Sequence, residues 1–356
     1  MDITRVLVRG KRDVILEQVE IPDHPQPGEI LIETDKTFIS AGTELANYTA
    51  LDPTVLNPGS WNSYPWPSGY ANAGHIIAIG DNIDGLIPGD RVFTFGKHAS
   101  HHCANLLDAG GIAAQSPGGS RRAKADMVVK IPDGVSSEDA AAARMAGVAI
   151  TALRVSTAQA GDSVVVFGLG MVGNLAAQYF TIQGCKVIGV DPMSARRKLA
   201  KKVGIEHVFG GPPEEVKAAV LELTGGRGAD TVVDAVGDSL VVDLGAQVTA
   251  HAGEVIILGS PREKHIGDLT SLIRPVHWNY VRFKGALEWQ VPAYPITGHR
   301  HSTYSNIQTY LDLINRGKLK LNELISHRMK PREIKRAYEN LLNDKEHYWG
   351  VILDWT

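Results

Sequence analysis

Hydrophobic and polar residues follow two different patterns along this chain. In the first hundred residues, apolar positions fall in short alternating runs, such as 29–33 and 75–79, that are separated by Gly and Pro turns. Alternation with a period of two is typical of strands that have one buried face. The N-terminal part is therefore predicted to be rich in β-structure. Residues 94–127 show no clear periodicity and are predicted to form a long surface loop.

The second pattern begins after residue 130. Residues 137–157 are rich in alanine and predict a helix, with Ser136 or Ser137 as its cap. From residue 163 onward, apolar runs typical of fully buried strands alternate with helical patterns. Strands are predicted at 163–167, 186–190, 231–235 and 254–258, and helices at 172–183, 195–203 and 239–248. This alternation predicts a parallel α/β domain. Residues 305–355 predict two helices and a closing strand at 350–354.

Composition narrows the class of protein. The 356 residues are 44% hydrophobic and 21% charged, with a formal net charge of −3, as expected of a globular chain long enough for two domains. Scattered lysines and arginines argue against nucleic-acid binding. The chain has neither a run of apolar residues long enough to span a membrane nor a signal-peptide pattern at its start, so we expect a cytoplasmic protein. Two cysteines cannot build a four-cysteine zinc lobe.

A dinucleotide-binding motif follows the strand predicted at 163–167. Its six positions are Gly168, Leu169, Gly170, Met171, Val172 and Gly173, which fit the pattern G-x-G-x-x-G. The first glycine permits a tight turn, the second lets the backbone approach a pyrophosphate, and the third lets the helix pack against the strand. The helix N-terminus adds partial positive charge. The motif therefore predicts a nicotinamide dinucleotide site.

Asp191 ends the next predicted strand, about 20 residues further along, where a carboxylate accepts hydrogen bonds from the adenosine ribose. A carboxylate there also repels a 2′-phosphate, which favours NAD(H) over NADP(H). Arg196 and Arg197 lie one turn beyond and leave NADP(H) open, because an arginine accommodates a 2′-phosphate.

The series of motifs resembles the medium-chain dehydrogenase/reductase superfamily of alcohol and polyol dehydrogenases. The resemblance rests on residues 160–167 running into the glycine motif, and on 227–237, 253–259 and 283–286. It implies a GroES-like β-rich catalytic domain at 1–151 and 291–356, a doubly wound Rossmann domain at 152–290, and an active site in the cleft. It also implies a homodimer that pairs through residues 282–289. The nicotinamide end of the cofactor is expected near Gly259, Ser260, Ala286 and Leu287, with Gly237 on the adenine side.

The resemblance also points to the metal ligands of zinc-dependent members, and none is a good ligand here. The three positions fall on Ala41, on Tyr70 and on Ala143 or its neighbour Arg144. Alanine cannot bind a metal, and tyrosine is a rare ligand for zinc. We therefore expect no catalytic metal. One alternative cluster, formed by His98, His101, His102 and Cys103 with His75, would need residues 98–102 to be helical.

Without zinc, side chains must assist the substrate oxygen. Thr43 matches the hydroxyl that passes on the alcohol proton in zinc enzymes, and Ala46 replaces the relay histidine of some members. Tyr70 can donate a hydrogen bond to a carbonyl, or can simply fill the space that the metal leaves. Glu44 can orient either group or act as a base, although a supporting role is the stronger interpretation. Arg144 can supply positive charge.

Residues 39–44 resemble a zinc-less subgroup that oxidises secondary alcohols on sugars, polyols or tetrapyrrole side chains. Aromatic residues suited to such substrates, or to interface loops, gather in two segments expected to rim the cleft: Trp61, Tyr64, Trp66, Trp289, Tyr294, His299 and His301. The leading hypothesis is an NAD-dependent dehydrogenase that moves hydride between the cofactor and a secondary alcohol. The alternatives are a zinc-independent quinone or enone reductase, which would favour NADPH, and a non-catalytic cofactor-binding protein.

Overall fold

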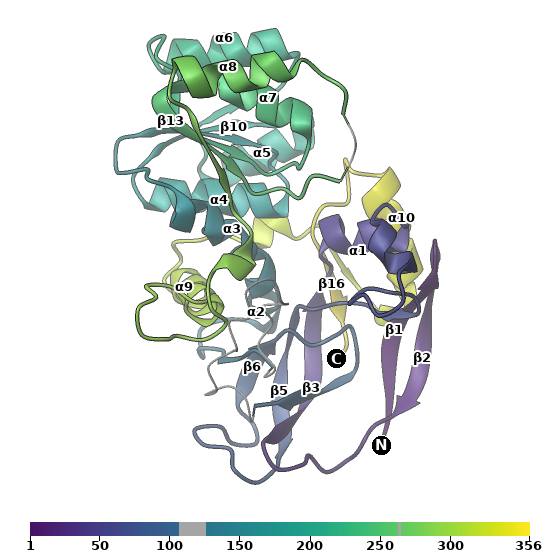
Figure 1. Cartoon of the computed structure of the whole chain (residues 1–356). Coiled ribbons are helices and arrows are strands. Elements are labelled where there is room, and N and C mark those ends of the chain that lie inside the picture. Colours follow the sequence, from purple (N-terminus) through teal and green to yellow (C-terminus); the bar gives the residue numbers. More distant parts are fainter. Residues whose placement is uncertain (107–125, 263–264) are drawn as a thin grey trace. The chain divides into compact units, whose positions relative to one another are not determined.

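The computed structural model describes residues 1–106, 126–262 and 265–356. The chain divides into two compact units (Figure 1). The first consists of Met1–Arg144, Val291–Gly317 and Ile325–Thr356, and the second of Met145–Gln290 and Lys318–Leu324. Across the described part of the chain, no helix has both the length and the apolar character needed to cross a bilayer.

The first unit contains two β-sheets. The smaller sheet has the order β2-β1-β4, and the larger has the order β15-β16-β3-β5-β6-β8, with β7 also paired to β3. The strands are β1 (Asp2–Gly10), β2 (Asp13–Glu20), β3 (Glu29–Phe38), β4 (Trp66–Pro67), β5 (Asn72–Ile79), β6 (Arg91–Thr94), β7 (His101–Asn105), β8 (Val128–Lys130), β15 (His327–Met329) and β16 (Val351–Asp354). Because β16 pairs antiparallel with β3, the end of the chain returns to the N-terminal strands.

Helices of the first unit cover these sheets. They are α1 (Ala41–Tyr48), η1 (Pro53–Leu56), α2 (Ser137–Ala141), α9 (Thr303–Asn315), η4 (Pro331–Glu333) and α10 (Ile334–Asn343). The alternation along β3 buries Ile30 and Ile32 together with Ile76 of β5 and Val92 of β6. A second core joins α1 to α10, where the rings of Tyr48 and Tyr338 lie 5.0 Å apart.

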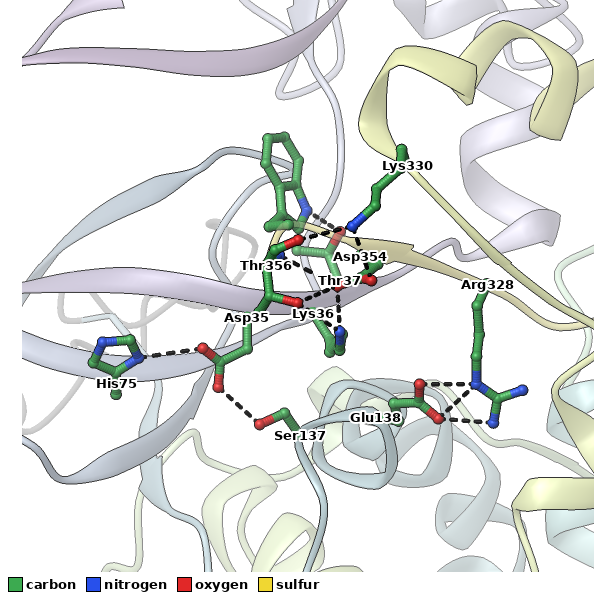
Figure 2. Close-up of polar contacts among 11 residues, drawn as sticks. Asp35, Lys36, Thr37, His75, Ser137, Glu138, Arg328, Lys330, Asp354 and Thr356 are labelled. Carbon is green, nitrogen blue, oxygen red and sulfur yellow. Dashed lines mark hydrogen bonds and ion pairs between the residues drawn. The ribbon is translucent and has the colours of Figure 1, made fainter.

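Charged side chains fasten β16 at the end of the chain (Figure 2). Asp354 accepts hydrogen bonds from Lys36 of β3 and, at 3.1 Å, from Lys330. Partial burial alone would raise the pKa of Asp354, but hydrogen bonds from Lys36, Thr356 and Lys330 hold that pKa well below its ordinary value. Next to Asp354, the Trp355 indole donates to the Thr37 hydroxyl at 3.0 Å.

The second unit is a parallel sheet of six strands in the order β11-β10-β9-β12-β13-β14. The strands are β9 (Ser163–Phe167), β10 (Lys186–Val190), β11 (His207–Phe209), β12 (Ala229–Asp234), β13 (Thr249–Ile257) and β14 (Arg282–Gly285). The helices are α3 (Ala143–Val155), which begins at the end of the first unit, α4 (Met171–Ile182), α5 (Ser194–Val203), α6 (Pro213–Leu223), α7 (Ser239–Val248), α8 (Leu269–Trp278), η2 (Glu288–Gln290) and η3 (Asn322–Leu324). Helices α6, α7 and α8 cover one face of the sheet and α4 the other (Figure 1).

The structure corrects two predicted elements. Residues 137–157 form α2 and α3 rather than one helix, with Ala142 as the C-cap of α2. Residues 94–127 are not one long loop, because β7 pairs with β3 over His101–Asn105. The remainder of the predicted loop, 107–125, lies outside the described residues. The pattern also misses the short strands β11, β14 and β15 and the helices α6 and α8.

Candidate functional site

Tyr70 lies at the centre of the candidate site in the first unit. It lies two residues before β5 and follows Gly69, whose φ of +89° is in the left-handed region. Burial raises the pKa of the Tyr70 phenol, and so does the nearby Glu44 carboxylate. Hydrogen bonds with the hydroxyls of Ser40 and Thr43 act in the opposite direction, as does the charge of Arg144, and the pKa remains above its ordinary value. The phenol is therefore protonated at neutral pH.

Arg144 supplies positive charge beside this phenol. It is the second residue of α3 and only 6% of it is exposed. The guanidinium carbon lies 5.4 Å from the ring centroid of Tyr70 and 4.5 Å from that of Phe95. Both distances are within the range of cation–π attraction. Of the predicted catalytic residues, Thr43, Tyr70 and Arg144 therefore lie close together.

Glu44 is fully buried, and its carboxylate is occupied by other groups of the protein. One oxygen accepts the backbone N–H of Ser40 at 2.8 Å, which caps the start of α1. The other lies 2.9 Å from Nε2 of His98 and accepts the hydroxyl of Tyr338 at 2.7 Å. This arrangement supports an orienting role for Glu44 rather than that of a base.

Four residues of this neighbourhood are absent from the sequence prediction of the catalytic set: Ser40, Phe95, His98 and Tyr338. Ser40 and Phe95 are near predicted residues in sequence or in space, and His98 carries a signal only as a possible metal ligand. Tyr338 has no signal at all, because 294 residues separate it from Glu44.

The alternative histidine cluster does not form a metal site. His101, His102 and Cys103 lie on the strand β7 and not on a helix, so the helical spacing with His98 that a metal site would need is absent. His98 instead bonds Glu44 and Thr37, while His75 lies near Asp35 and Glu33. Among the described residues, no group of three or more His, Cys, Asp or Glu side chains is arranged to hold a metal.

The zinc positions implied by the family also offer no donor set. Ala41 and Ala143 have no ligating atom, and the Tyr70 oxygen is engaged with two hydroxyls. The neighbouring Arg144 is a permanent cation, which opposes binding of a second cation. The residues present therefore do not fit a catalytic zinc ion.

The glycine motif of the second unit has the geometry that a pyrophosphate cradle needs. Gly168 has a φ of +86°, and a Cβ on Gly173 would lie 1.8 Å from the Gly168 carbonyl oxygen. A Cβ on Gly170 would meet only the Arg196 side chain, at 3.9 Å, so the backbone here is open to a ligand. Helix α4 begins at Met171, and its first N–H groups are free of intrahelical partners.

Asp191 lies next to this turn and is 1% exposed. One carboxylate oxygen accepts the N–H of Leu169 at 2.8 Å, and the other accepts the N–H of Met193 at the same distance. The Arg196 guanidinium lies 3.5 Å from the first of these oxygens. Arg197 does not reach the carboxylate, because it donates to the Asp191 and Pro192 carbonyls.

The remaining predicted cofactor residues lie at the carboxyl ends of β12, β13 and β14, where α/β proteins bind ligands. Gly237 and Gly259 pack so closely that a Cβ on Gly259 would lie 2.2 Å from the Gly237 nitrogen. A Cβ on Gly237 would meet the Ser260 carbonyl oxygen at 2.5 Å. Ala286 is buried and donates to the Ile257 carbonyl, whereas Leu287 is 62% exposed.

The predicted aromatic rim is only partly available. Trp66 is 1% exposed and packs edge-on against Trp61, with ring centroids 5.7 Å apart. The hydroxyl of Tyr64 donates to the Asn47 carbonyl, and that of Tyr294 donates to the Asp126 carbonyl at 2.7 Å. Trp66 is therefore buried, and the hydroxyls of Tyr64 and Tyr294 are engaged within the protein. Trp61 remains 43% exposed.

The comparisons with known proteins extend over both units. Residues 171–288 match the model of the family described as zinc-binding dehydrogenase. The chain is 28% identical to L-threonine 3-dehydrogenase of Pyrococcus abyssi over 338 residues, 88% of each chain. It is also 28% identical to 2-desacetyl-2-hydroxyethyl bacteriochlorophyllide A dehydrogenase of Cereibacter sphaeroides, over 100% of this chain and 99% of that protein.

Solved structures are similar over 99% of this chain. An oxidoreductase of unknown specificity from Escherichia coli has a TM-score of 0.81 at 17% identity, with 99% of its chain covered. A zinc-binding dehydrogenase from Sinorhizobium meliloti bound to NADP has a TM-score of 0.76, and an alcohol dehydrogenase from E. coli in complex with NADH has 0.77. Both are 17% identical, with 99% of each chain covered.

These matches show that the chain is similar to dehydrogenases, with residues 171–288 resembling the zinc-binding dehydrogenase family. The fold is that of the medium-chain alcohol dehydrogenases, an α/β architecture of two units. The curated relatives, among them (R,R)-butanediol dehydrogenase and D-xylulose reductase, support an oxidoreductase that acts on an alcohol.

Proposed function

We propose that this protein transfers hydride between NAD(H) and a secondary alcohol or ketone of a sugar, polyol or ring substrate, without a catalytic zinc ion. The observation that carries the proposal is the Tyr70 phenol, which hydrogen-bonds with Ser40 and Thr43 beside the Arg144 guanidinium. Hydrogen-bond donors and fixed positive charge are what a developing alkoxide needs when no metal is present.

Each side chain has a defined task in this proposal. Tyr70 donates a hydrogen bond to the substrate oxygen, because burial and Glu44 raise its pKa and keep the phenol protonated. Thr43 and Ser40 orient the phenol. During alcohol oxidation, Tyr70 takes up the alcohol proton and passes its own proton to one of these hydroxyls, which releases a proton to solvent. Arg144 stabilises negative charge on the oxygen as the carbon loses hydride. When bound, the nicotinamide ring supplies the hydride acceptor for that carbon.

Zinc independence rests on the chemistry of the side chains. Ala41, Tyr70 and Ala143 occupy the positions that the family resemblance assigns to ligands, and Arg144 is a cation at the same place. We therefore derive no step through a metal. Thr43, Tyr70 and Arg144 are the proposed catalytic residues, and Glu44 is a supporting one.

The preference for NAD(H) rests on Asp191. Its negative charge lies beside the glycine turn, and such a charge disfavours a 2′-phosphate. Arg196 partly offsets that charge, because its guanidinium lies 3.5 Å from the carboxylate. The proposed cofactor site contains the motif residues 168–173 and Asp191, Arg196, Gly237, Gly259, Ser260, Ala286 and Leu287.

The substrate class rests on two observations. One full-length relative is a dehydrogenase whose name specifies a hydroxyethyl bacteriochlorophyllide. The exposed Trp61 ring offers a flat apolar face that suits a sugar or another ring. A secondary alcohol on a ring or on a polyol is consistent with both observations.

We further propose a homodimer. The strand β14 is at the end of the six-strand order, and its outer edge has no strand partner among the described residues. Nearby in the chain, Ile273, Trp278 and Tyr280 are exposed by 51%, 71% and 65%. An open strand edge beside exposed apolar side chains is suited to pairing with a second copy. Sedimentation velocity at micromolar concentration tests this, and a monomer would contradict it.

Two assays test the proposed activity. Fluorescence titration with NADH and NADPH measures the cofactor preference, and we expect tighter binding of NADH. A panel of sugars, polyols, ring-bearing alcohols and enones, followed by nicotinamide absorbance, then identifies the reaction. Turnover of enones with NADPH, but of no alcohol with NAD, would replace this proposal with a double-bond reductase.

A further inference from the structure

His98 is in contact with both segments that carry the Tyr70 hydroxyl network. Its backbone N–H donates to the Ser68 carbonyl at 2.9 Å. A Cβ on Gly69 would lie 2.5 Å from the His98 nitrogen and 2.6 Å from its ring carbon Cγ. The imidazole therefore packs directly on the peptide that precedes Tyr70. Its Nε2 reaches Glu44, which caps the helix that carries Thr43.

The hydrogen bonds of the His98 ring form a directed chain. Trp355 can only donate, so Thr37 accepts the indole N–H at 3.0 Å. The Thr37 hydroxyl lies 2.7 Å from Nδ1 of His98 and is free to donate its own proton there. Nε2 then carries the ring proton and donates a hydrogen bond to the Glu44 carboxylate. Every polar atom of the ring is thereby satisfied in a site with no exposed surface.

Tyr338 makes the same connection from the C-terminal helix α10. Its hydroxyl lies 2.7 Å from the Glu44 carboxylate and 3.0 Å from the Ser68 hydroxyl. The carboxylate of Glu44 thus receives a donor from His98, one from Tyr338 and one from the Ser40 backbone. All of these residues are buried, so each lost hydrogen bond leaves a charged group unsatisfied.

We propose that His98 and Tyr338 are positioning residues, which hold Glu44 and residues 68–70 so that the Tyr70 phenol meets the Ser40 and Thr43 hydroxyls. The inference rests on the proposed function in assigning a catalytic value to Tyr70. The positioning itself is a property of the protein without substrate. The charge of Glu44 acts on the phenol as well, because it is one of the causes that raise the pKa of Tyr70.

A pair of tyrosine variants separates positioning from general stability. Tyr338→Phe and Tyr48→Phe each remove one hydroxyl from the same buried ring pair. The Tyr48 hydroxyl bonds Glu339 and the Arg12 carbonyl instead of Glu44. We expect the two variants to lose comparable stability, whereas only Tyr338→Phe should change the pKa of Tyr70.

The readout is the ionisation of Tyr70, followed in protein labelled with ¹³C at tyrosine Cζ, with Tyr70→Phe assigning the signal. Tyr338→Phe and His98→Leu should raise the pKa of Tyr70, because its hydrogen bonds with Ser40 and Thr43 lower it and depend on the cluster. Glu44→Gln removes the charge and should lower it by about one unit. His98→Gln, which retains an N–H donor, should restore most of the wild-type value.

Kinetics form the second arm of the experiment. His98→Leu should reduce kcat by about 10- to 100-fold with KM nearly unchanged, as expected when a reacting group is misplaced. A changed Tyr70 ionisation with unchanged kcat would support the positioning role and contradict the catalytic role of Tyr70. An unchanged Tyr70 ionisation in folded His98→Leu and Tyr338→Phe proteins would overturn the inference.

Discussion

Nε2 of His98 lies 2.9 Å from the Glu44 carboxylate, and neither side chain has any exposed surface. In zinc-dependent relatives, the sequence resemblance assigns a supporting role to the acid at the position of Glu44. Here that acid faces His98 and Tyr338, and the position implied for a ligand is Tyr70. The site therefore has a buried support around Glu44, and Tyr70, the proposed phenol donor, occupies the position that the resemblance assigns to a metal ligand.

Replacement of the Tyr70 hydroxyl should abolish most of the activity. We expect Tyr70→Phe to lower kcat by about 10²- to 10⁴-fold, the range that a positioned proton donor contributes. NADH binding should be unchanged, because the proposed cofactor residues are in the other unit. Steady-state assays with the best alcohol from the panel measure the effect. Tyr48→Phe is the matched control, and equal turnover of the two variants would contradict the role of Tyr70.

Alcohol oxidation should become faster as pH rises above neutrality. The folded-state pKa of Tyr70 is raised by burial and by Glu44, so the phenol holds its proton throughout the neutral range. Oxidation needs a group that can take up the alcohol proton, and ketone reduction needs the protonated phenol. Profiles of kcat/KM against pH should therefore rise for oxidation up to at least the ordinary tyrosine range near pH ~10. An oxidation profile that is level from pH 6 to 10 would refute this assignment.

The fold should lose stability in strong alkali. Burial raises the pKa of Tyr294 to about 12 and raises that of Tyr338 well above its ordinary value. The unfolded chain releases these protons near pH ~10, so stability falls as pH rises from there through the folded-state values. Urea unfolding at pH 8, 10 and 11 measures this. Tyr294→Phe should make the free energy of unfolding fall less steeply with pH. A urea midpoint that is constant across these pH values would be inconsistent with the burial of the tyrosines.

Gly69 should tolerate no side chain, since His98 packs against it. Gly69→Ala incurs about 1–2 kcal/mol from its left-handed backbone, and the clash with His98 adds to that cost. Gly59→Ala is the control, because Gly59 has a φ of +84° but a Cβ added there would meet nothing within 4 Å. We expect Gly69→Ala to be the less stable variant in urea and the only one with reduced kcat. Equal behaviour of the two would show that the His98 contact is unimportant.

Cofactor preference should depend on the charge of Asp191. Asp191→Asn removes the repulsion of a 2′-phosphate and leaves Arg196 without an ionic partner, so NADPH binding should improve about tenfold relative to NADH. Fluorescence titration measures both dissociation constants. Asp162→Asn is a suitable control, because Asp162 precedes β9 at the opposite end of that strand from the glycine motif. An unchanged ratio would remove Asp191 from the specificity site.

The sequence predicts the second unit better than the catalytic neighbourhood. Residues 163–167 and 239–248 have the predicted bounds, because buried apolar runs and helical periodicity are local signals. The cluster around Glu44 depends on residues separated by 54 and 294 positions, and no local pattern reports such contacts. The spacing of His98 and its neighbouring histidines suggests a metal, and only the β-strand geometry of residues 101–105 shows otherwise.

Turnover by metal-free protein is the most direct measure of whether the reaction needs zinc. Protein treated with a strong chelator, with its zinc content determined by elemental analysis, would be assayed against the alcohol panel and NAD. If side chains alone assist the substrate oxygen, the protein should keep full kcat with far less than one zinc ion per chain, and Tyr70→Phe should show a large loss. Activity that disappears with the metal and returns on adding Zn²⁺ would contradict it.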